Sequence, residues 1–197
     1  MLEVELKSVV DDVAHRRALV EAAGAVLVFE GRLEDRRFDS NSRALTQIDQ
    51  VLRVRVYRDA HSVRAELDWK GATRRQDGYK LREELEVRFT DPEALITILE
   101  KLGYEVTIAI DREIAQYDFN GAMIRFEHYP RMDDLVEVEG TPPQIEAAIV
   151  ATGLPRDGFT SERLPDFALR FRERTGTPAA LSWQVLAGHE AYDESNA

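Results

Sequence analysis

The first seven residues of the chain alternate charged and apolar side chains, in the order Met1-Leu2-Glu3-Val4-Glu5-Leu6-Lys7. Alternate side chains of a β-strand point to the same face, so Glu3, Glu5 and Lys7 share one face of the predicted strand. Carboxylate oxygens are the ligands that Mg²⁺ and Mn²⁺ prefer, and an ammonium group can neutralise a phosphoryl oxygen. The segment therefore predicts a polar face that could hold a divalent cation beside an anionic ligand.

The same alternation returns in five later segments, each with charged side chains on one face and mostly apolar side chains on the other. Their charged faces carry Arg53 and Arg55; Arg64, Glu66, Asp68 and Lys70; Arg82, Glu84, Glu86 and Arg88; Arg125 and Glu127; and Glu137 and Glu139. Charged residues make up 32% of the chain, which is above the share of about a quarter that globular proteins usually have. Where these side chains point therefore decides the fold and the function.

Alternation and turn residues predict eight strands, and apolar spacing with end caps predicts four helices. The predicted strands are Leu2–Lys7, Ala25–Glu30, Gln50–Arg58, Ser62–Lys70, Lys80–Phe89, Glu105–Tyr117, Ala122–Tyr129 and Asp134–Glu139. The predicted helices run from Asp11 or Asp12 to Gly24, over Glu93–Leu102, over Gln144–Thr152 and over Pro165–Arg174. The segment Ser40–Gln47 is predicted to be a polar loop.

Two architectures fit strands that have one charged face. In the first, an antiparallel sheet packs on helices and turns its charged side to solvent. In the second, the sheet closes into a barrel, helices cover its apolar outside, and the charges line the lumen. Closure needs about eight strands, which leave a narrow interior. Buried charges are costly unless water, metal ions or a ligand satisfy them, so the closed form predicts a site for a polyanion and divalent cations.

Length and composition limit the class of protein. The 197 residues fit one domain with an extension, which we place at residues 1–180 with a partly mobile tail at residues 181–197. The net charge of −11 argues against nonspecific binding to nucleic acid or to anionic membranes. The absence of cysteine excludes disulfides and thiol catalysis. No apolar run approaches the roughly 20 residues of a membrane span and no signal peptide opens the chain, so a cytoplasmic protein is expected.

The ordered set of acidic and basic pairs resembles the CYTH superfamily, the triphosphate tunnel metalloenzymes, whose name joins a class of adenylate cyclases with thiamine triphosphatase. The resemblance is carried by Glu3, Glu5 and Lys7; Arg53 and Arg55 in LRVRVY; Lys70 in LDWKG; Arg82, Glu84 and Glu86 in REELEV; Arg112 in DREIAQY; Glu127 in IRFEHYP; and Glu137 and Glu139 in LVEVEG. Two features depart from the family pattern. Arg112 lacks basic neighbours on its strand, and Glu127 stands where aspartate is common.

The resemblance implies an α+β fold in which an eight-stranded antiparallel closed β-barrel forms a tunnel, with helices packed on the outside. It also implies that seven cations bind the phosphoryl oxygens of a small-molecule triphosphate: Lys7, Arg53, Arg55, Lys70, Arg82, Arg112 and Arg125. Seven carboxylates would bind Mg²⁺ or Mn²⁺: Glu3, Glu5, Glu84, Glu86, Glu127, Glu137 and Glu139. Glu3, Glu5 and Lys7 would form the catalytic group.

Three functions fit this pattern. The first is a metal-dependent phosphohydrolase that acts on inorganic triphosphate, thiamine triphosphate or a nucleoside triphosphate. The second is a class IV-type adenylate cyclase, which converts ATP to cyclic AMP and pyrophosphate. The third is a non-catalytic module that binds polyphosphate or a nucleotide. We also consider a homodimer, because Trp183 lies in a segment without a readable pattern.

Overall fold

A computed structural model of the chain describes residues 2–76 and 79–189, without the side chains of residues 2, 3, 79 and 80. The described part contains nine strands: β1 (Leu2–Val9), β2 (Val26–Ser40), β3 (Val51–Arg58), β4 (Val63–Lys70), β5 (Arg74–Gln76), β6 (Tyr79–Phe89), β7 (Tyr104–Phe119), β8 (Ala122–His128) and β9 (Leu135–Glu139). Helices separate several of these strands along the chain.

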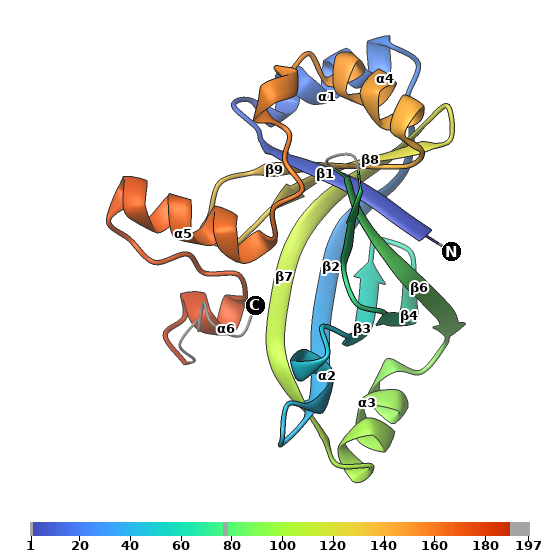
Figure 1. The fold of residues 1–197 in the computed structure, drawn as a ribbon, viewed down its shortest axis with the longest axis vertical. Helices are drawn as coiled ribbons and strands as arrows, with labels where there is room; N and C mark the ends of the chain where they lie inside the picture. The colour runs from blue at the N-terminus through green and yellow to red at the C-terminus, as the bar shows by residue number, and fades with distance from the viewer. Residues whose placement is uncertain (1, 77–78, 190–197) are drawn as a thin grey trace.

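Eight of the strands close into an antiparallel barrel. Their order around the wall is β1-β9-β8-β7-β2-β3-β4-β6, and β6 pairs with β1 to complete the ring. β5 is a short extra strand that pairs with the start of β6. The predicted closed, eight-stranded antiparallel barrel is therefore confirmed, and the sheet with a solvent-facing charged side is not the fold. Figure 1 shows the long strands β2 and β7, which pair with each other, extending along the height of the barrel.

The largest difference from the predicted elements lies in β2, which continues to Ser40, well past the predicted end at Glu30. The missed part begins at Gly31 and carries charge on both faces. Asp35 and Arg37 line the inside of the barrel, whereas the intervening Arg36 pairs with a carboxylate outside it. Because neither face is apolar, the sequence shows no alternation that would mark this part as a strand.

The helices lie outside the barrel. They are α1 (Val13–Ala22), α2 (Ala44–Gln47), α3 (Pro92–Lys101), α4 (Pro142–Thr152), α5 (Leu164–Thr175) and α6 (Trp183–Leu186). Figure 1 shows α1 and α4 side by side over one end of the barrel, α3 at the other end, and α5 beside β9. The four predicted helices are present, while α2 lies in the segment predicted to be a loop and α6 lies where no helix is predicted. Across the described residues, every helix is too short or too polar to cross a membrane.

Local sequence sets where these helices begin and end. The side chain of Asp91 accepts a hydrogen bond from Ala94 N, and Pro92 occupies the first turn, so α3 begins there. At the end of α4, Gly153 has φ of 66°, a left-handed conformation that glycine adopts more readily than residues with a side chain.

Three apolar clusters join the helices to the outer face of the barrel. The first contains Leu6, Tyr117, Ile124, Val138, Ile145 and Ile149 among others, the second Leu135, Leu164 and Phe167, and the third Phe38, Val54 and Leu99. They place α4, α5 and α3, respectively, against the wall. Burial of apolar surface is the main source of stability, so the outside of the barrel holds the fold while the inside is available for charge.

A fourth apolar cluster, which we call the apolar plug, consists of Phe29, Leu33, Tyr57 and Ile114. It lies inside the barrel. Leu33 and Tyr57 are directly opposite each other on β2 and β3, and the next pair on the same face is Asp35 and Arg55. Charged and apolar side chains thus follow one another along the same inward face.

Residues after α4 form an extension that binds the barrel at two places. Lys7 and Thr160 exchange backbone hydrogen bonds of 2.9 and 2.8 Å, at a point on β1 beyond its pairing with β6. Asp111 N donates to Leu181 O at 2.7 Å, and Asp111 Oδ2 accepts from Trp183 N at 3.0 Å. Leu181 is fully buried. The boundary predicted after residue 180 stays a prediction, and residues 190–197 of the predicted tail lie outside the described residues.

Candidate functional site

The inward faces of the strands bring together many buried charges. The described side chains of this kind are Glu5, Asp35, Arg53, Arg55, Glu66, Asp68, Lys70, Arg82, Arg112, Arg125, Glu127 and Glu137. Lys7 belongs with them, because its side chain is only 12% exposed. A buried charge is tolerated only where it is paired and hydrogen-bonded, so the partners of these groups define the site.

A cavity of about 190 Å³ lies among these side chains. In the described part, nine cations line it, namely Lys7, Arg37, Arg53, Arg55, Lys70, Arg82, Arg112, Arg125 and Arg163, and six carboxylates do so, namely Glu5, Asp35, Asp39, Asp49, Glu137 and Glu139. The chain as a whole has a net charge of −11. The charged side chains on the cavity wall therefore sum to a positive charge, whereas the whole chain is negative. An anion is the ligand that the cavity wall favours.

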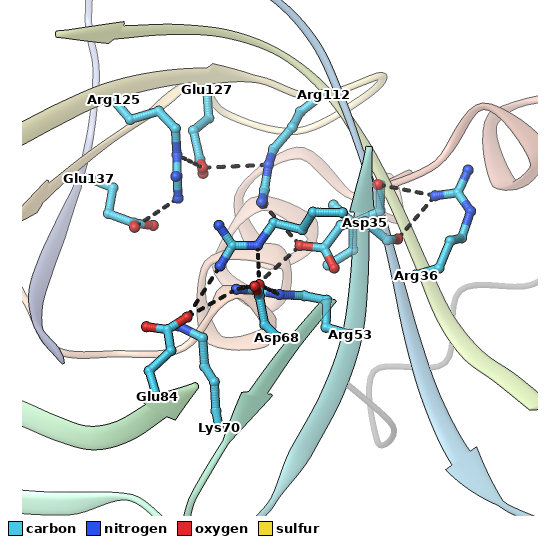
Figure 2. Close-up of polar contacts among 12 residues, drawn as sticks. Asp35, Arg36, Arg53, Asp68, Lys70, Glu84, Arg112, Arg125, Glu127 and Glu137 are labelled. Atoms are coloured by element: carbon cyan, nitrogen blue, oxygen red, sulfur yellow. Dashed lines mark hydrogen bonds and ion pairs between the residues drawn. The ribbon is translucent and has the colours of Figure 1, made fainter. Parts of the chain in front are cut away.

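Two aspartates hold the arginines of β3 in place. Asp68 Oδ2 accepts from Arg53 Nε and Nη2 at 3.0 and 2.9 Å and lies 2.7 Å from Arg55 Nε. Asp35 Oδ2 lies 3.3 Å from both Arg53 Nη1 and Arg112 Nη2. Figure 2 shows Arg53 and Arg112 reaching toward Asp35 from different strands. Like charges can remain this close because each carboxylate attracts two of them.

A second network joins β8, β9 and β1. Arg125 donates to Glu127 Oε1 at 2.9 Å and to Glu137 Oε1 at 2.8 Å. Lys7 Nζ lies 2.9 Å from Glu137 Oε2 and 3.2 Å from Glu5 Oε1. The hydroxyl of Tyr129 donates to Glu127 Oε2 at 2.5 Å. Acids and bases therefore alternate across three neighbouring strands.

The protonation of this network follows from burial and pairing. Burial by itself raises the pKa of Glu137, but the charges of Arg125 and Lys7 outweigh it and lower this pKa to about 2. Burial lowers the pKa of Lys7, while Glu137, Glu5 and Glu127 raise it, and the net pKa lies above the usual value for lysine. Both groups are therefore charged near neutral pH.

The cavity opens near α2 and the start of α5, where its wall includes exposed side chains. Asp49 has a half-exposed side chain and Arg163 is exposed, although both line the cavity. Arg82 donates from Nη2 to Asp49 O at 2.7 Å and from Nε to Gly71 O at 2.6 Å. Burial raises the pKa of Asp49, but hydrogen bonds from Thr73 and the charges of Arg82 and Arg163 lower it below its usual value. We call this open end of the cavity, bordered by Asp49, Arg82 and Arg163, the mouth.

All seven cations predicted to bind phosphate lie on the cavity wall: Lys7, Arg53, Arg55, Lys70, Arg82, Arg112 and Arg125. They come from β1, β3, β4, β6, β7 and β8, so closure of the barrel is what brings them together. Arg112 reaches the site without basic neighbours on its own strand, because Asp35 on β2 holds it. Phosphate binding by these residues stays a prediction.

The carboxylates predicted to bind metal divide into those on the cavity wall and those beside it. Glu5, Glu137 and Glu139 line the cavity. Glu127 is buried next to it and is engaged by an arginine and a tyrosine. Glu84 lies 3.3 Å from Lys70 and 3.5 Å from Arg55, and so takes part in ion pairing.

Glu3 and Glu86 are the two remaining predicted metal ligands. The side chain of Glu3 lies outside the described residues, although its backbone is paired with Arg82 of β6. Glu86 is exposed and belongs to an acidic group that adjoins the cavity through Asp68, in which Glu66, Asp68 and Glu86 each offer one oxygen within 4.8 Å of the others. Burial, together with the charges of Glu66 and Asp68, raises the pKa of Glu86, and Arg88 lies 3.6 Å from both Glu66 and Glu86.

The carboxylates on the cavity wall fit a hard divalent cation. Glu5 and Glu139 are directly opposite each other on β1 and β9, and Lys7 and Glu137 are the next opposed pair. The charge of Glu5 acts to raise the pKa of Glu137, so these two carboxylates repel each other. A divalent cation would relieve this repulsion, and the oxygen donors are the kind that Mg²⁺ and Mn²⁺ prefer.

Among the described residues, five charged side chains of the cavity wall are not among the predicted site residues: Asp35, Arg37, Asp39, Asp49 and Arg163. The first three lie on the part of β2 beyond the predicted strand, where charge on both faces leaves no alternation that would mark the inward residues. Asp39 also accepts hydrogen bonds from the backbone of Leu45 and Thr46, which fixes α2 at the mouth. Asp49 and Arg163 lie outside the strands and helices and carry no periodic signal.

Comparison with known proteins gives one sequence match. A family model, the CYTH domain, matches residues 1–148, which contain every predicted site residue. The extension with Arg163 lies beyond the matched residues. Among curated proteins, none matches the chain.

Solved structures share the fold at low sequence identity. A Vibrio parahaemolyticus protein that is provisionally named an adenylate cyclase has a TM-score of 0.73 at 18% identity, over 85% of this chain and 97% of its own. A Pyrococcus horikoshii protein has a TM-score of 0.67 at 20% identity, over 85% and 98%. A Hippeastrum protein, provisionally named an adenylyl cyclase and described as having a dominant triphosphatase activity, has a TM-score of 0.61 at 18% identity, over 92% and 98%.

Proposed function

The chain belongs to the CYTH domain family, and on that premise we propose that it is a metal-dependent phosphohydrolase acting on a triphosphate-containing substrate. The observation that best supports this proposal is the charge of the cavity. Among the described side chains, nine cations and six carboxylates line it, in a chain whose net charge is −11. A linear triphosphate carries several negative charges on a narrow chain, which matches a barrel lumen lined with cations.

The arginines are suited to hold such a chain. A guanidinium group offers planar N–H donors that match phosphoryl oxygens. Arg53, Arg55 and Arg112 are already held by Asp35 and Asp68 before a ligand binds. Donors that are in position need little reorganisation when charge develops during reaction, which is the condition for electrostatic catalysis.

Hydrolysis adds water to a phosphorus atom, breaks one P–O–P bond and leaves negative charge on the departing oxygen. Lys7 and Arg125 border the acidic side of the cavity, where they would neutralise this charge. The chemistry that a divalent cation supplies, when held by Glu5, Glu137 and Glu139, is neutralisation of phosphoryl charge and acidification of water. Glu3 is the further ligand that the sequence predicts.

The same residues could bind ATP in the orientation needed for cyclisation, in which the ribose 3′-hydroxyl attacks the α-phosphorus and pyrophosphate leaves. The Vibrio parahaemolyticus structure is provisionally named for this activity. A cavity whose charges bind polyphosphate without turnover is the third option. These options differ in their products and can be separated directly.

The test is incubation of the protein with tripolyphosphate, thiamine triphosphate or ATP, each with Mg²⁺ or Mn²⁺. We expect release of orthophosphate from at least one substrate and none after chelation of the metal. Cyclic AMP and pyrophosphate from ATP, without orthophosphate, would replace the proposal with a cyclase. Binding of tripolyphosphate without any product would replace it with a binding module.

Glu5→Gln provides the matching variant, because it removes one charge from the acidic side of the cavity with little change in volume. We expect at least ~10²-fold lower turnover, the size of effect seen when an electrostatic group is removed from an active site. Glu146→Gln on the outer surface of α4 is the control, and it should keep full activity. Full activity of Glu5→Gln would contradict the role assigned to the acidic side.

A further inference from the structure

The apolar plug closes the lumen at one end. Leu33 is fully buried, and Tyr57 and Ile114 are 3% exposed. The rings of Phe29 and Tyr57 meet edge to face, with centroids 5.5 Å apart. The guanidinium of Arg64 lies 4.1 Å from the centroid of Tyr57 and 5.2 Å from that of Phe29, so it makes cation–π contacts with both rings. The plug is therefore a packed layer and not a loose constriction.

The boundary between the plug and the cavity lies within one pleat of β3. Arg53 and Arg55 line the cavity, whereas the next inward residue, Tyr57, does not. Arg55 Nη1 donates to the hydroxyl of Tyr57 at 3.0 Å, which links the charged part of the lumen to the plug. Two residues of a strand span about 6.6 Å. The cavity wall, as far as the described residues define it, contains no member of the plug.

The mouth has the opposite character. It is bordered by Asp49, whose side chain is 50% exposed, and by the exposed Arg163. Leu164 and Pro165 at the start of α5 also line it. Eight-stranded barrels normally fill their interior with side chains, so the plug is the expected state of such a lumen, and the open, charged part is the exception.

We infer that the lumen is a blind tunnel that takes only the free end of a linear phosphate chain, entering through the mouth. This inference rests on the proposed function and narrows its substrate class to linear chains with an accessible terminal phosphate. An interior segment of a long polyphosphate would have to leave past the plug, where Phe29 and Tyr57 pack edge to face and Arg64 lies over both rings, so the described cavity wall does not continue through this layer. Only the terminal phosphates can reach Arg53 and Arg55, and the rest of the chain stays outside the mouth.

The number of protein molecules that bind one long linear polyphosphate tests the inference without requiring turnover. With chelator present and protein in excess, the mass of the complex is measured by sedimentation. A blind tunnel permits two copies per chain, one at each end, and none on a chain whose two ends carry bulky amide-linked groups. Three or more copies per chain, or equal binding of the capped chain, would overturn the inference.

Two variants ensure that binding is in the lumen. Arg53→Gln should lower the affinity for polyphosphate at least tenfold, whereas Arg156→Gln, which changes an exposed arginine, should leave it unchanged. Equal loss in both variants would mean surface adsorption and would also overturn the inference.

If the protein is active, the chain lengths of its products give a second test of the inference. Early in the reaction, cleavage near a chain end yields a short phosphate and a chain of nearly full length. Early fragments of intermediate length would contradict a blind tunnel. A protein that binds chain ends but hydrolyses no triphosphate would support the inference while contradicting the proposed phosphohydrolase activity.

Discussion

Along β2 and β3 the two ends of the barrel lumen are built from the same inward face, yet one end is charged and open while the other is apolar and packed. On β3 the change occurs between Arg55 and Tyr57, and on β2 it occurs between Asp35 and Leu33. Closure of the barrel supplies the interior, but the residue type at each inward position decides whether that interior is filled or kept as a site.

The two ends are also stabilised by different forces. At the plug, apolar side chains exclude water and pack closely. At the charged end, each buried ion depends on a partner, and the cost of burial is offset only while the pair is intact. The stability of variants at the two ends should therefore depend differently on pH and on added anions.

The largest loss of stability is expected from Asp35→Ala. This change leaves Arg53 and Arg112 without the carboxylate that lies 3.3 Å from each. Removing one partner of a buried pair typically costs about 3–5 kcal/mol, and we expect a loss in this range in the free energy of unfolding, measured with denaturant. Asp35→Asn keeps the shape and should lose less. Tripolyphosphate should stabilise Asp35→Ala more than it stabilises the unchanged protein, and equal stabilisation would contradict the pairing.

A smaller loss is expected at the packed end from Leu33→Ala. Leu33 is fully buried, and truncating a buried leucine costs about 2–5 kcal/mol through lost transfer energy and a cavity. Leu33→Met keeps the volume and should cost less than about 1.5 kcal/mol. Both values come from denaturant unfolding. Tripolyphosphate should not restore the Leu33→Ala protein preferentially, and a preferential gain would show that the plug and the charged end are not independent.

Acid should weaken the charged end through Glu137. Its pKa is lowered from 4.5 to about 2 in the folded protein, so its contribution is complete above pH 4.5 and is lost as the pH falls through 2. A shift of this size corresponds to about 3 kcal/mol at most. The difference in unfolding free energy between the unchanged protein and Glu137→Gln should therefore close between pH 4.5 and 2, and a constant difference over that range would contradict the assignment.

The smallest effect is expected on the outer surface. Glu146 on α4 lies 2.8 Å from Arg156, and both side chains are about half exposed. Exposed ion pairs contribute about 0–1 kcal/mol, so Glu146→Gln should change the free energy of unfolding by less than about 1 kcal/mol. A larger loss in the same denaturant experiment would mean that position, and not burial, decides which charges matter.

The sequence was sufficient for the parts of the barrel where one face is apolar. The alternation around Arg53 and Arg55, and around Glu137 and Glu139, predicts a strand and separates its charged face from its apolar face. The resemblance to the CYTH family was needed to predict that the charged face turns inward. The second half of β2 escaped because Arg36 and its neighbours place charge on the outer face as well. Asp35 was lost with that strand, although it holds two arginines of the site.

The position of the plug and the placement of Arg163 cannot be predicted from periodicity. Period two tells which face Tyr57 shares with Arg55, but it does not tell that the lumen changes from charged to apolar between them. The placement of Arg163 at the mouth depends on how the extension folds back onto Lys7 through Thr160. Contacts between residues this far apart in the chain leave no local pattern in the sequence.

The hydrogen bonds between Thr160 and Lys7 have a consequence for where the working unit ends. The family match stops at residue 148, yet the backbone of a predicted catalytic residue is completed by a segment beyond that limit, and the same segment carries Arg163 to the entrance. Relatives that share the barrel but differ in this segment would have a different mouth leading to the same lumen. Ligand choice could then diverge between family members while every strand of the barrel stays the same.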